Sequence, residues 1–238
     1  MAGFTGLDRL FEGRHFDREV IVLCVRWYLR FKLSYRDLVG MMAGRGLPMV
    51  HTAIMRWVHR YAPEFERRWN RFARPTGPSW RVDETYIKVR GEWVYLYRAV
   101  DHEGNTVDFR LSARRDVIAA KAFFRKAMKS QGPAPGTVTL DGSAASHRAM
   151  REMKADGQLP RALKVRSSKY LNNLIEQDHR GVKSRTGPML GFKGFGTAAI
   201  TIAGIELSRR IHKGQFNLGG LRLKDRSTPS VWNAVLAA

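Results

Sequence analysis

Three acidic residues in separate parts of the 238-residue chain have positions that suit metal chemistry. Asp83 lies within the strand-like stretch "WRVDETYIKV", Asp141 follows the apolar run "TVTL", and Glu176 lies in the helix-like stretch "NNLIEQDHRGVKSR". An ionised carboxylate in an apolar sheet costs free energy unless it is paired or binds a metal. Because a strand alternates its faces, at most one of Asp83 and the adjacent Glu84 can join a given site.

As a group, the three carboxylates predict phosphodiester chemistry. Magnesium takes oxygen ligands, usually one or two carboxylates completed by waters and substrate phosphates. Three carboxylates from separate elements can hold two such ions about 4 Å apart, one at the attacking oxygen and one at the leaving oxygen. Taken singly, each acid is more often the partner in a salt bridge or a helix cap. The prediction therefore depends on the three acids lying together.

The stretches around these acids predict a mixed sheet with flanking helices. After the proline-containing linker 73–80, the runs "WRVDETYIKV", "WVYLYRAVD" and "TVDFRLS" are joined by short turns and predict an antiparallel meander. A helix, a buried strand that ends at Asp141, a second helix and the extended run "RALKVRS" follow. The helix around Glu176 and a last helix over 197–213 complete the order. We interpret the aromatic residues of "WVYLYRAV" as core rather than as a base-stacking platform.

The first 75 residues predict three helices arranged as a helix-turn-helix. Apolar residues recur at helical spacing over 16–31, and Ser34 with Asp37 resembles a capping box at the start of the second helix. The break "GRGLPM" precedes a third helix, "VHTAIMRWVHRYAP", predicted to end before Pro63. In such an arrangement the last helix enters the major groove of DNA. Its candidate DNA-binding residues are His51, Thr52, Arg56 and Arg60, although a plain three-helix bundle remains an alternative.

The charge of the chain favours a polyanionic partner. The sequence has 42 Lys and Arg against 21 Asp and Glu, a formal net charge of +21. Nucleic acid is the leading candidate, while a membrane surface or ribosomal RNA would attract the same charge. Residues 161–193 hold eight basic residues against two acidic ones. Four of these basic residues are candidate phosphate contacts: Lys169, Arg180, Lys183 and Arg185.

The composition excludes several other classes of protein. A hydrophobic share of 44% argues against general disorder. The single cysteine, Cys24, leaves no intrachain disulfide and no cysteine-based zinc site, which fits a reducing cytosol. No apolar stretch approaches the roughly 20 residues that span a bilayer, so we expect a cytoplasmic protein without a membrane partner. The residues His147, His179 and His212 lack a cluster of ligands, and we predict no metal role for them.

Several motifs together resemble a known family. They are "GRHFDREVIVLCVRWYLRFKLSYRDL", "WRVDETYIKVRGEWVYLYRAVD", "TVDFRLS", "TLDGSAA", "KYLNNLIEQDHRGVKSR", "GFKGF" and "AGIELSRRIHKGQ". Their order resembles the ribonuclease H-like fold, and the whole set resembles the DDE transposases of bacterial insertion sequences, specifically the family named after insertion sequence six. The resemblance covers the chain from about Phe11 to Gln215.

The resemblance implies roles for individual residues. Asp83 and Asp141 would be the catalytic aspartates and Glu176 the catalytic glutamate, all three as metal ligands. Glu176 lies 35 positions after Asp141, the spacing that such transposases show. The family also has a basic residue seven positions after the glutamate, here Lys183, which would lie two helical turns further along the same face. Without the resemblance, Lys183 is equally a solvated lysine. The motif around the second aspartate departs from many relatives at Gly142 and Ser143.

The resemblance also implies an activity and a domain order. Residues 1–75 would bind terminal inverted repeats, residues 76–215 would form the ribonuclease H-like catalytic domain, and residues 216–238 would be a tail of unknown role. With two Mg²⁺ ions, or Mn²⁺ in their place, the enzyme would cleave double-stranded DNA at the ends of the element and join them to target DNA. Transposition would be replicative, through cointegrates, by a homodimer or higher oligomer. The alternatives are a DNA-binding regulator with structural acids and a nuclease of the same fold without strand transfer.

Overall fold

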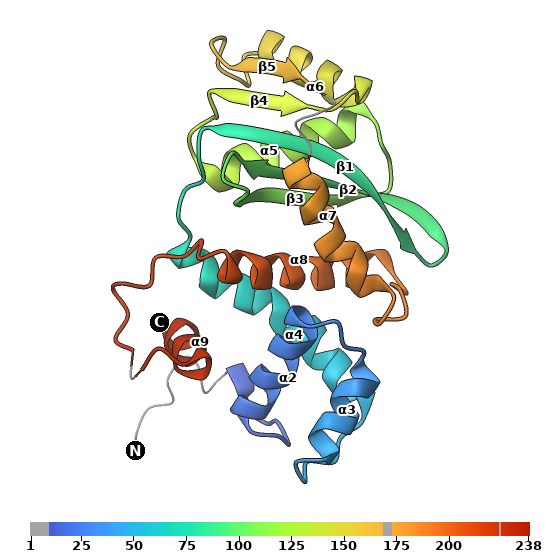
Figure 1. Cartoon of the computed structure of the whole chain (residues 1–238), viewed down its shortest axis with the longest axis vertical. Helices are drawn as coiled ribbons and strands as arrows, with labels where there is room; N and C mark the ends of the chain where they lie inside the picture. The colour runs from blue at the N-terminus through green and yellow to red at the C-terminus, as the bar shows by residue number, and fades with distance from the viewer. Residues whose placement is uncertain (1–9, 169–172, 224) are drawn as a thin grey trace. The chain divides into compact units, whose positions relative to one another are not determined.

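A five-stranded sheet forms the centre of the region that carries the predicted acids (Figure 1). The computed structural model describes residues 10–168, 173–223 and 225–238, without the side chains of residues 173, 174 and 176–178. The strands follow the order β3-β2-β1-β4-β5. The first three are antiparallel neighbours, and β4 and β5 continue the sheet in parallel with β1. The bounds are β1 Ser79–Val89, β2 Glu92–Asp101, β3 Thr106–Ser112, β4 Thr137–Leu140 and β5 Lys164–Ser167.

This topology confirms the predicted ribonuclease H-like mixed sheet, a three-strand antiparallel meander extended by parallel strands. The turn between β1 and β2 consists of Arg90 and Gly91, with φ angles of +54° and +86°. Two consecutive positive φ angles are typical of the tight turns whose twist matches the flanking strands. Glycine adopts this conformation without strain, whereas Arg90 does so at a modest cost.

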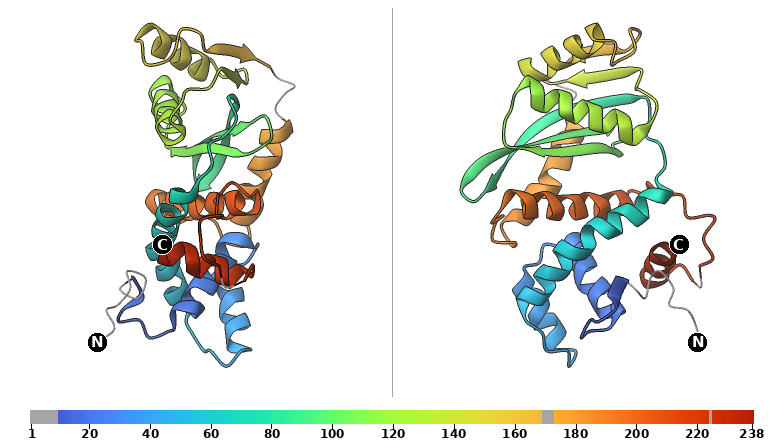
Figure 2. Two further views of the ribbon diagram at one scale, coloured as in Figure 1. Left: turned by 90° about the vertical axis from the view of Figure 1, so that its left-hand side faces the viewer. Right: turned by 180° about the vertical axis from the view of Figure 1, so that it is seen from behind.

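Helices cover both faces of the sheet (Figure 1, Figure 2). Helices α5 (Val117–Gln131) and α6 (Ala144–Ala155) lie on one face, and α7 (Asn173–Thr186) contacts β1 and β2 on the other. The Asp116 side chain caps α5 by accepting the Ala119 N–H at 2.8 Å. The core between the sheet and α5 and α6 includes Trp80, Val82, Tyr97, Phe123 and Met150.

The chain divides into two compact units. The sheet unit comprises residues 75–187 and 191–195, and the helical unit comprises residues 1–74, 188–190 and 196–238. The boundary after Arg74 lies close to the expected one. Residues 196–215, expected in the catalytic domain, belong to the helical unit together with the expected tail.

The helical unit contains α2 (Arg18–Arg30), α3 (Tyr35–Ala43), α4 (His51–Trp69), a 3-10 turn (Asn70–Phe72), α8 (Phe195–His212) and α9 (Thr228–Ala237). Among α2, α3 and α4, each helix contacts the other two. The predicted capping box is confirmed, since Asp37 N–H donates to Ser34 Oγ and Ser34 N–H donates to the Asp37 carboxylate. Helix α8 packs closely against Leu29 of α2 at Gly204, because a Cβ atom at this position would lie 2.6 Å from the Leu29 side chain.

Helix α4 is longer than the sequence predicted, because it continues through Pro63 to Trp69. Proline inside a helix removes one hydrogen bond and usually ends or bends the helix. Here Pro63 is exposed, and the opposite face stays buried on both sides of it, from Ile54 to Trp69. The burial of that face offsets the lost hydrogen bond. The connection from α3 to α4 runs from Gly44 to Val50, which is longer than the three or four residues of a standard helix-turn-helix.

The tail that had no predicted role forms a helix that packs in the helical unit. Trp232 of α9 is buried, with its ring centroid 5.3 Å from that of Phe65 and 5.2 Å from that of Trp69. The Arg71 side chain donates to the Ala238 carbonyl at 2.9 Å. Helix α9 therefore contributes to the core of this unit. Across the described residues, no helix combines the length and the apolar character needed to cross a membrane.

Candidate active site

Two of the three predicted acids lie side by side at the centre of the sheet. Strands β1 and β4 are parallel neighbours, and Val82 of β1 lies opposite Leu140 of β4. Asp83 follows Val82 in the sequence and Asp141 follows Leu140, so the two aspartates come at the same level of the sheet. The two carboxyl groups lie close enough that each affects the pKa of the other. The register of these two strands is therefore what brings together residues that are 58 positions apart in the sequence.

Asp141 lies in surroundings that disfavour its negative charge. Burial raises its pKa to about 6, and the charges of Glu84 and Asp83 act in the same direction. The hydrogen bond from the Ser143 N–H to Asp141 Oδ1, at 3.0 Å, opposes this rise only in part. At neutral pH the negative charge of the site is therefore only partly neutralised by the neighbouring positive and hydrogen-bonding groups.

Asp83 is held in its ionised form by a histidine that the sequence analysis did not select. Burial acts to raise the Asp83 pKa, but contact with the His179 imidazole and the Glu84 N–H leaves it below its usual value. His179 Nε2 lies 3.3 Å from Asp83 Oδ2, and His179 is buried on α7. The prediction of no metal role for His179 is not contradicted, but His179 belongs to the site. Its position one helical turn after Glu176 was the available signal.

Glu84 has different partners from Asp83, in agreement with the alternation of strand faces. Its carboxylate accepts from Arg115 Nε at 3.1 Å and from the Ser146 hydroxyl of α6. A second guanidinium nitrogen of Arg115 lies 3.0 Å from Glu84 and 4.0 Å from Asp141. Arg115, also absent from the sequence prediction, thus neutralises Glu84 beside the two aspartates.

Helix α7 carries the other predicted residues of the site. The backbone of Glu176 belongs to α7, one turn before His179, while its side chain lies outside the described part of the structure. Lys183 and Arg180 are exposed on α7, whereas Arg185 is buried. The DNA contact expected of Arg185 stays a prediction. The predicted contact Lys169 lies outside the described residues.

The predicted DNA-binding residues of α4 are accessible. His51, Arg56 and Arg60 are exposed and Thr52 is half-buried. Thr52, Arg56 and Arg60 follow one another at steps of four residues, so their side chains line one side of the helix. A cationic strip of this kind is suited to phosphate contacts along a groove.

The donor set fits a hard divalent cation. Within the described residues, no group of three histidine, cysteine or acidic side chains lies close enough to hold a metal ion. The paired carboxylates of Asp83 and Asp141 nevertheless offer oxygen ligands with uncompensated negative charge. Oxygen ligands and excess negative charge are what Mg²⁺ requires of a protein site, with water and substrate oxygens supplying the remaining positions.

The raised pKa of Asp141 predicts a stability cost in the metal-free protein. We expect Asp141→Asn to raise the free energy of unfolding at pH 8 by about 2 to 3 kcal/mol, with the side chain only 24% exposed. A carboxyl group whose pKa rises on folding carries no penalty below its unfolded pKa, and the full penalty above its folded pKa. The advantage of the variant should therefore shrink as the pH falls from about 6 to 4.

Urea unfolding in the presence of a chelator at several pH values measures this difference. Asp156→Asn, which removes an exposed carboxylate at the end of α6, is the matched control and should show no such pH trend. The same stability difference between Asp141→Asn and the parent protein at pH 4.5 and pH 8 would contradict the electrostatic explanation.

Comparison with known proteins places the chain in a family. A family model described as a DDE domain matches residues 77–215, more than half of the chain. The transposase for insertion sequence element IS257 in transposon Tn4003 of Staphylococcus aureus is 39% identical over 208 residues, which cover 85% of this chain and 88% of that protein. The transposase for insertion sequence-like element IS431mec of Staphylococcus aureus strain Mu50 is 38% identical with the same coverage.

Solved structures of lower similarity are integrase catalytic cores. The catalytic core domain of BIV integrase is 15% identical, with a TM-score of 0.41 and coverage of 55% of this chain and 83% of that one. The HTLV-2 integrase catalytic core domain in complex with magnesium is 16% identical, with a TM-score of 0.39 and coverage of 68% and 99%. The family assignment comes from the sequence relatives, which cover most of both chains. The chain belongs to the DDE transposases of bacterial insertion sequences, in the family named after insertion sequence six.

Proposed function

We propose that this transposase binds the terminal inverted repeats of its insertion sequence, cleaves the DNA at both ends and joins the ends to target DNA. The observation that carries the proposal is the pairing of Asp83 and Asp141 on adjacent parallel strands, with α7 packed against β1 beside them. Three acids from three elements are what two-metal phosphodiester chemistry requires.

Asp83, Asp141 and Glu176 are proposed to hold Mg²⁺, with Mn²⁺ as a substitute. The bound ions would lower the pKa of a water molecule and neutralise charge on the phosphate. His179 fixes the orientation of the Asp83 carboxylate and favours its ionised form, which is the form that binds a cation. Arg115 pairs with Glu84 and also lies 4.0 Å from Asp141, so it offsets part of the negative charge beside the two aspartates.

The reaction proceeds in two displacements at phosphorus. In the first, the oxygen of water bonds to the phosphorus at the end of the element, and the 3'-hydroxyl of that end leaves. In the second, this hydroxyl bonds to a phosphorus of the target strand, and the target 3'-oxygen leaves. Exposed Lys183 and Arg180 on α7 bind phosphates next to the reacting group. No covalent bond to the protein is needed.

Recognition of the ends is assigned to α4 in the helical unit. Its exposed His51, Arg56 and Arg60, with Thr52, present donors and positive charge along one helix. A homodimer or higher oligomer follows from the need to hold two ends at once. Replicative transposition through cointegrates is the outcome expected of this family.

The proposal is tested by a cleavage assay whose substrate is the DNA that flanks the gene on both sides, where the inverted repeats are expected. We expect the purified protein to nick a fragment that carries both inverted repeats in Mg²⁺ or Mn²⁺ and to join the freed 3'-ends to a supercoiled target plasmid. Excess chelator should abolish both products while DNA binding remains. Cleavage that persists in chelator would refute the metal-dependent mechanism. Binding without cleavage would favour a regulator, and cleavage without joining would favour a nuclease.

A further inference from the structure

The hairpin of β1 and β2 exposes two aromatic side chains, Tyr86 and Trp93, of which Trp93 was interpreted as core from the sequence. Trp93 is 59% exposed and Tyr86 is 45% exposed, whereas Leu96 and Tyr97 further along β2 are buried. The pairing of β2 with β3 runs only from Tyr95 to Val100, so the outer part of the hairpin has no neighbouring strand on that side. The interpretation as core is therefore wrong for Trp93, whereas Tyr95 packs against the buried core. An exposed tryptophan beside an exposed tyrosine indicates a contact surface.

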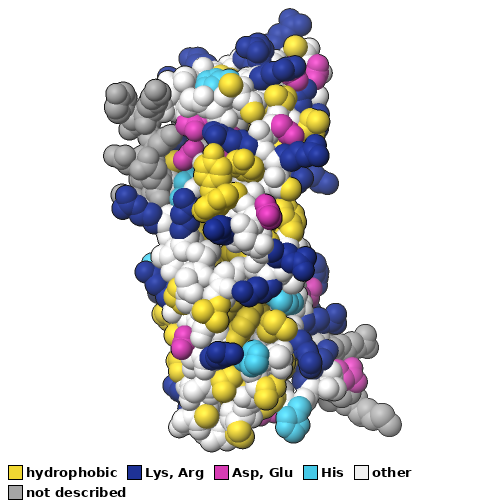
Figure 3. Space-filling view, turned by 90° about the vertical axis from the view of Figure 1, so that its right-hand side faces the viewer, with side chains coloured by type: hydrophobic (Ala, Val, Ile, Leu, Met, Phe, Trp, Pro, Cys, Tyr) yellow, Lys and Arg dark blue, Asp and Glu magenta, His cyan; other side chains and the backbone are white. Residues whose placement is uncertain are grey.

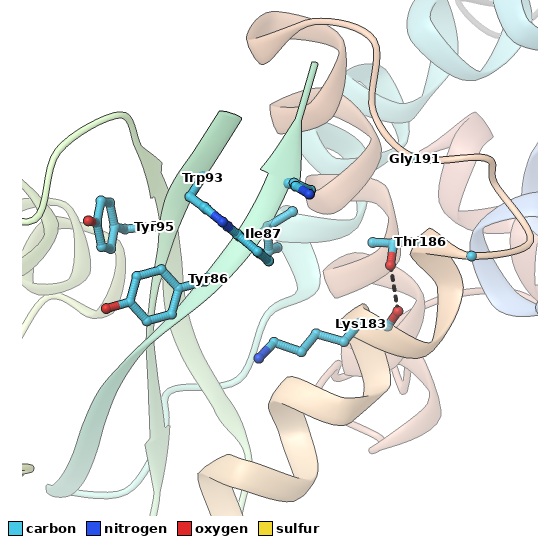
Figure 4. Close-up of a pocket in the computed structure, with 9 residues that line it drawn as sticks. Tyr86, Ile87, Trp93, Tyr95, Lys183, Thr186 and Gly191 are labelled. Atoms are coloured by element: carbon cyan, nitrogen blue, oxygen red, sulfur yellow. Dashed lines mark hydrogen bonds between the residues drawn. The ribbon is translucent and has the colours of Figure 1, made fainter. Parts of the chain in front are cut away.

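These aromatic residues line a cavity of about 800 Å³ within the sheet unit. The hairpin forms one wall and the C-terminal part of α7 the other, and Lys183 extends from α7 toward the hairpin (Figure 4). The volume is in the range of sites that bind small organic groups. The lining residues are Tyr86, Ile87, Lys88, Trp93, Tyr95, Lys183, Thr186, Gly187 and Gly191.

The hairpin wall is an ordered array of rings. Tyr86 pairs with Tyr95 across the two strands, and Lys88 pairs with Trp93, so all four side chains project from the same face. The rings of Tyr86 and Tyr95 lie 5.1 Å apart, and those of Tyr86 and Trp93 lie 6.2 Å apart at an interplanar angle of 80°. The hairpin is fixed near its tip by a hydrogen bond of 2.9 Å from the Arg90 N–H to the Phe192 carbonyl.

Positive charge borders the rings. Lys88 Nζ lies 5.1 Å from the centroid of the Trp93 ring, and Lys183 stands on the opposite wall. The surface in Figure 3 shows a patch of exposed hydrophobic side chains with Lys and Arg side chains around it. Flat aromatic faces next to cations match a ligand that combines a planar base with a phosphate.

The cavity lies close to the proposed catalytic acids. Tyr86 follows Asp83 by three residues on β1, a distance of about 10 Å along the strand, and its side chain projects from the other face of the sheet. Lys183 follows His179, the partner of Asp83, by four residues on α7, a rise of about 6 Å. A DNA strand with a phosphate at Asp83 and Asp141 would pass the edge of β1, which pairs with β4 only as far as Val82, to bring a neighbouring nucleotide to the rings.

We infer that the cavity between the hairpin and α7 binds one unpaired nucleobase of the DNA strand next to the reacting phosphate. The base stacks on the Trp93 ring with the Tyr86 ring at its edge, and Lys88 and Lys183 contact the flanking phosphates. In a duplex both faces of a base are covered by its neighbours, so only an unpaired or extruded base can stack on these rings. This inference rests on the proposed function, because it places the base beside the strand that is cut.

Binding in chelator tests the cavity separately from the chemistry. The probe is a duplex of arbitrary sequence with one unpaired base, compared with the same duplex fully paired. We expect the protein to prefer the first probe, and Trp93→Ala to reduce that preference by about 5- to 100-fold, the usual contribution of one stacked base. Trp93→Phe, which retains a ring, should keep most of the preference. Ile118→Ala, at an exposed residue of α5 outside the cavity, is the matched control.

The dependence on salt separates stacking from charge. Lys88→Gln should reduce the slope of log affinity against log salt concentration by about one, because one phosphate contact is lost. Trp93→Ala should leave that slope unchanged. A tryptophan variant that binds both probes like the parent protein would overturn the inference.

Photocrosslinking locates the base in the unmodified protein. With 5-iodouracil as the unpaired base, we expect crosslinked peptides that contain Trp93 or Tyr86. Crosslinks confined to other parts of the chain would refute the inference. The inference would also be refuted if no crosslink formed at Trp93 or Tyr86 and Trp93→Ala converted a dimer of the protein into a monomer. In the last case the cavity would hold a second copy of the chain.

The two proposals can fail separately. If Trp93→Ala keeps its preference for the unpaired base and the parent protein cleaves element ends in Mg²⁺, only the base site is refuted. If the parent protein binds and crosslinks the base in chelator but cuts no DNA in any divalent metal, the base site is supported and the transposition chemistry is refuted.

Discussion

We expect Asp83→Asn and Asp141→Asn each to lower the rate of end cleavage and strand transfer by at least about a thousandfold, while affinity for the element ends stays within a few-fold of the parent protein. The amide keeps the shape of the carboxylate but cannot bind a divalent cation as an anion. The two residues are adjacent across β1 and β4, so either substitution removes one side of the same site. Rates from single-turnover gels, with affinities from band shifts in chelator, measure the two effects.

The control for these two variants is the loss of a carboxylate that does not affect activity. Asp156→Asn in the same unit should keep full activity, since Asp156 is exposed and its described partners are Lys121, at 3.5 Å, and Gln158, at 3.2 Å, both outside the proposed site. Asp141→Asn should also be more stable than the parent protein in chelator, which separates loss of chemistry from loss of folding. A purified Asp83→Asn or Asp141→Asn protein that cleaves at the parental rate would remove that residue from the site.

The sheet was predictable because its strands carry local signals. Alternation and short turns delimit β1, β2 and β3, and the two-residue turn at Arg90 and Gly91 requires antiparallel pairing. The positions of the two aspartates in and after strands made them candidates, but their contact depends on the parallel register of β1 with β4. No local pattern encodes the register of two strands that are joined by a long crossover.

The remaining features depend on tertiary packing. Alternation on β2 predicts which face Trp93 occupies but not whether anything covers that face. His179 has no recognisable motif of its own, and its contact with Asp83 requires α7 to lie on β1. Pro63 signals a helix end, yet burial of the opposite face of α4 overrides that signal. In each case a neighbour distant in sequence decides the outcome.

Trp232→Ala should destabilise the helical unit by about 3 to 5 kcal/mol, although Trp232 lies in a segment to which the sequence analysis assigned no role. The indole is buried between Phe65 and Trp69, and the Arg26 guanidinium lies 5.3 Å from its centroid. Truncation to alanine removes these contacts and leaves a cavity. Urea unfolding followed by circular dichroism measures the change, with separate transitions allowed for the two units.

Trp93→Ala is the matched control, because it removes the same side chain from an exposed position and should cost less than about 1 kcal/mol. The two variants should also differ in their effects on DNA binding. Trp232→Ala should weaken binding to element ends to the extent that the helical unit unfolds, and Trp93→Ala should alter only the preference for an unpaired base. Equal stability losses in the two variants would show that α9 is not part of the helical core. A loss confined to Trp232→Ala would instead establish that α4 depends on α9 for the packing that holds its DNA-binding face in place.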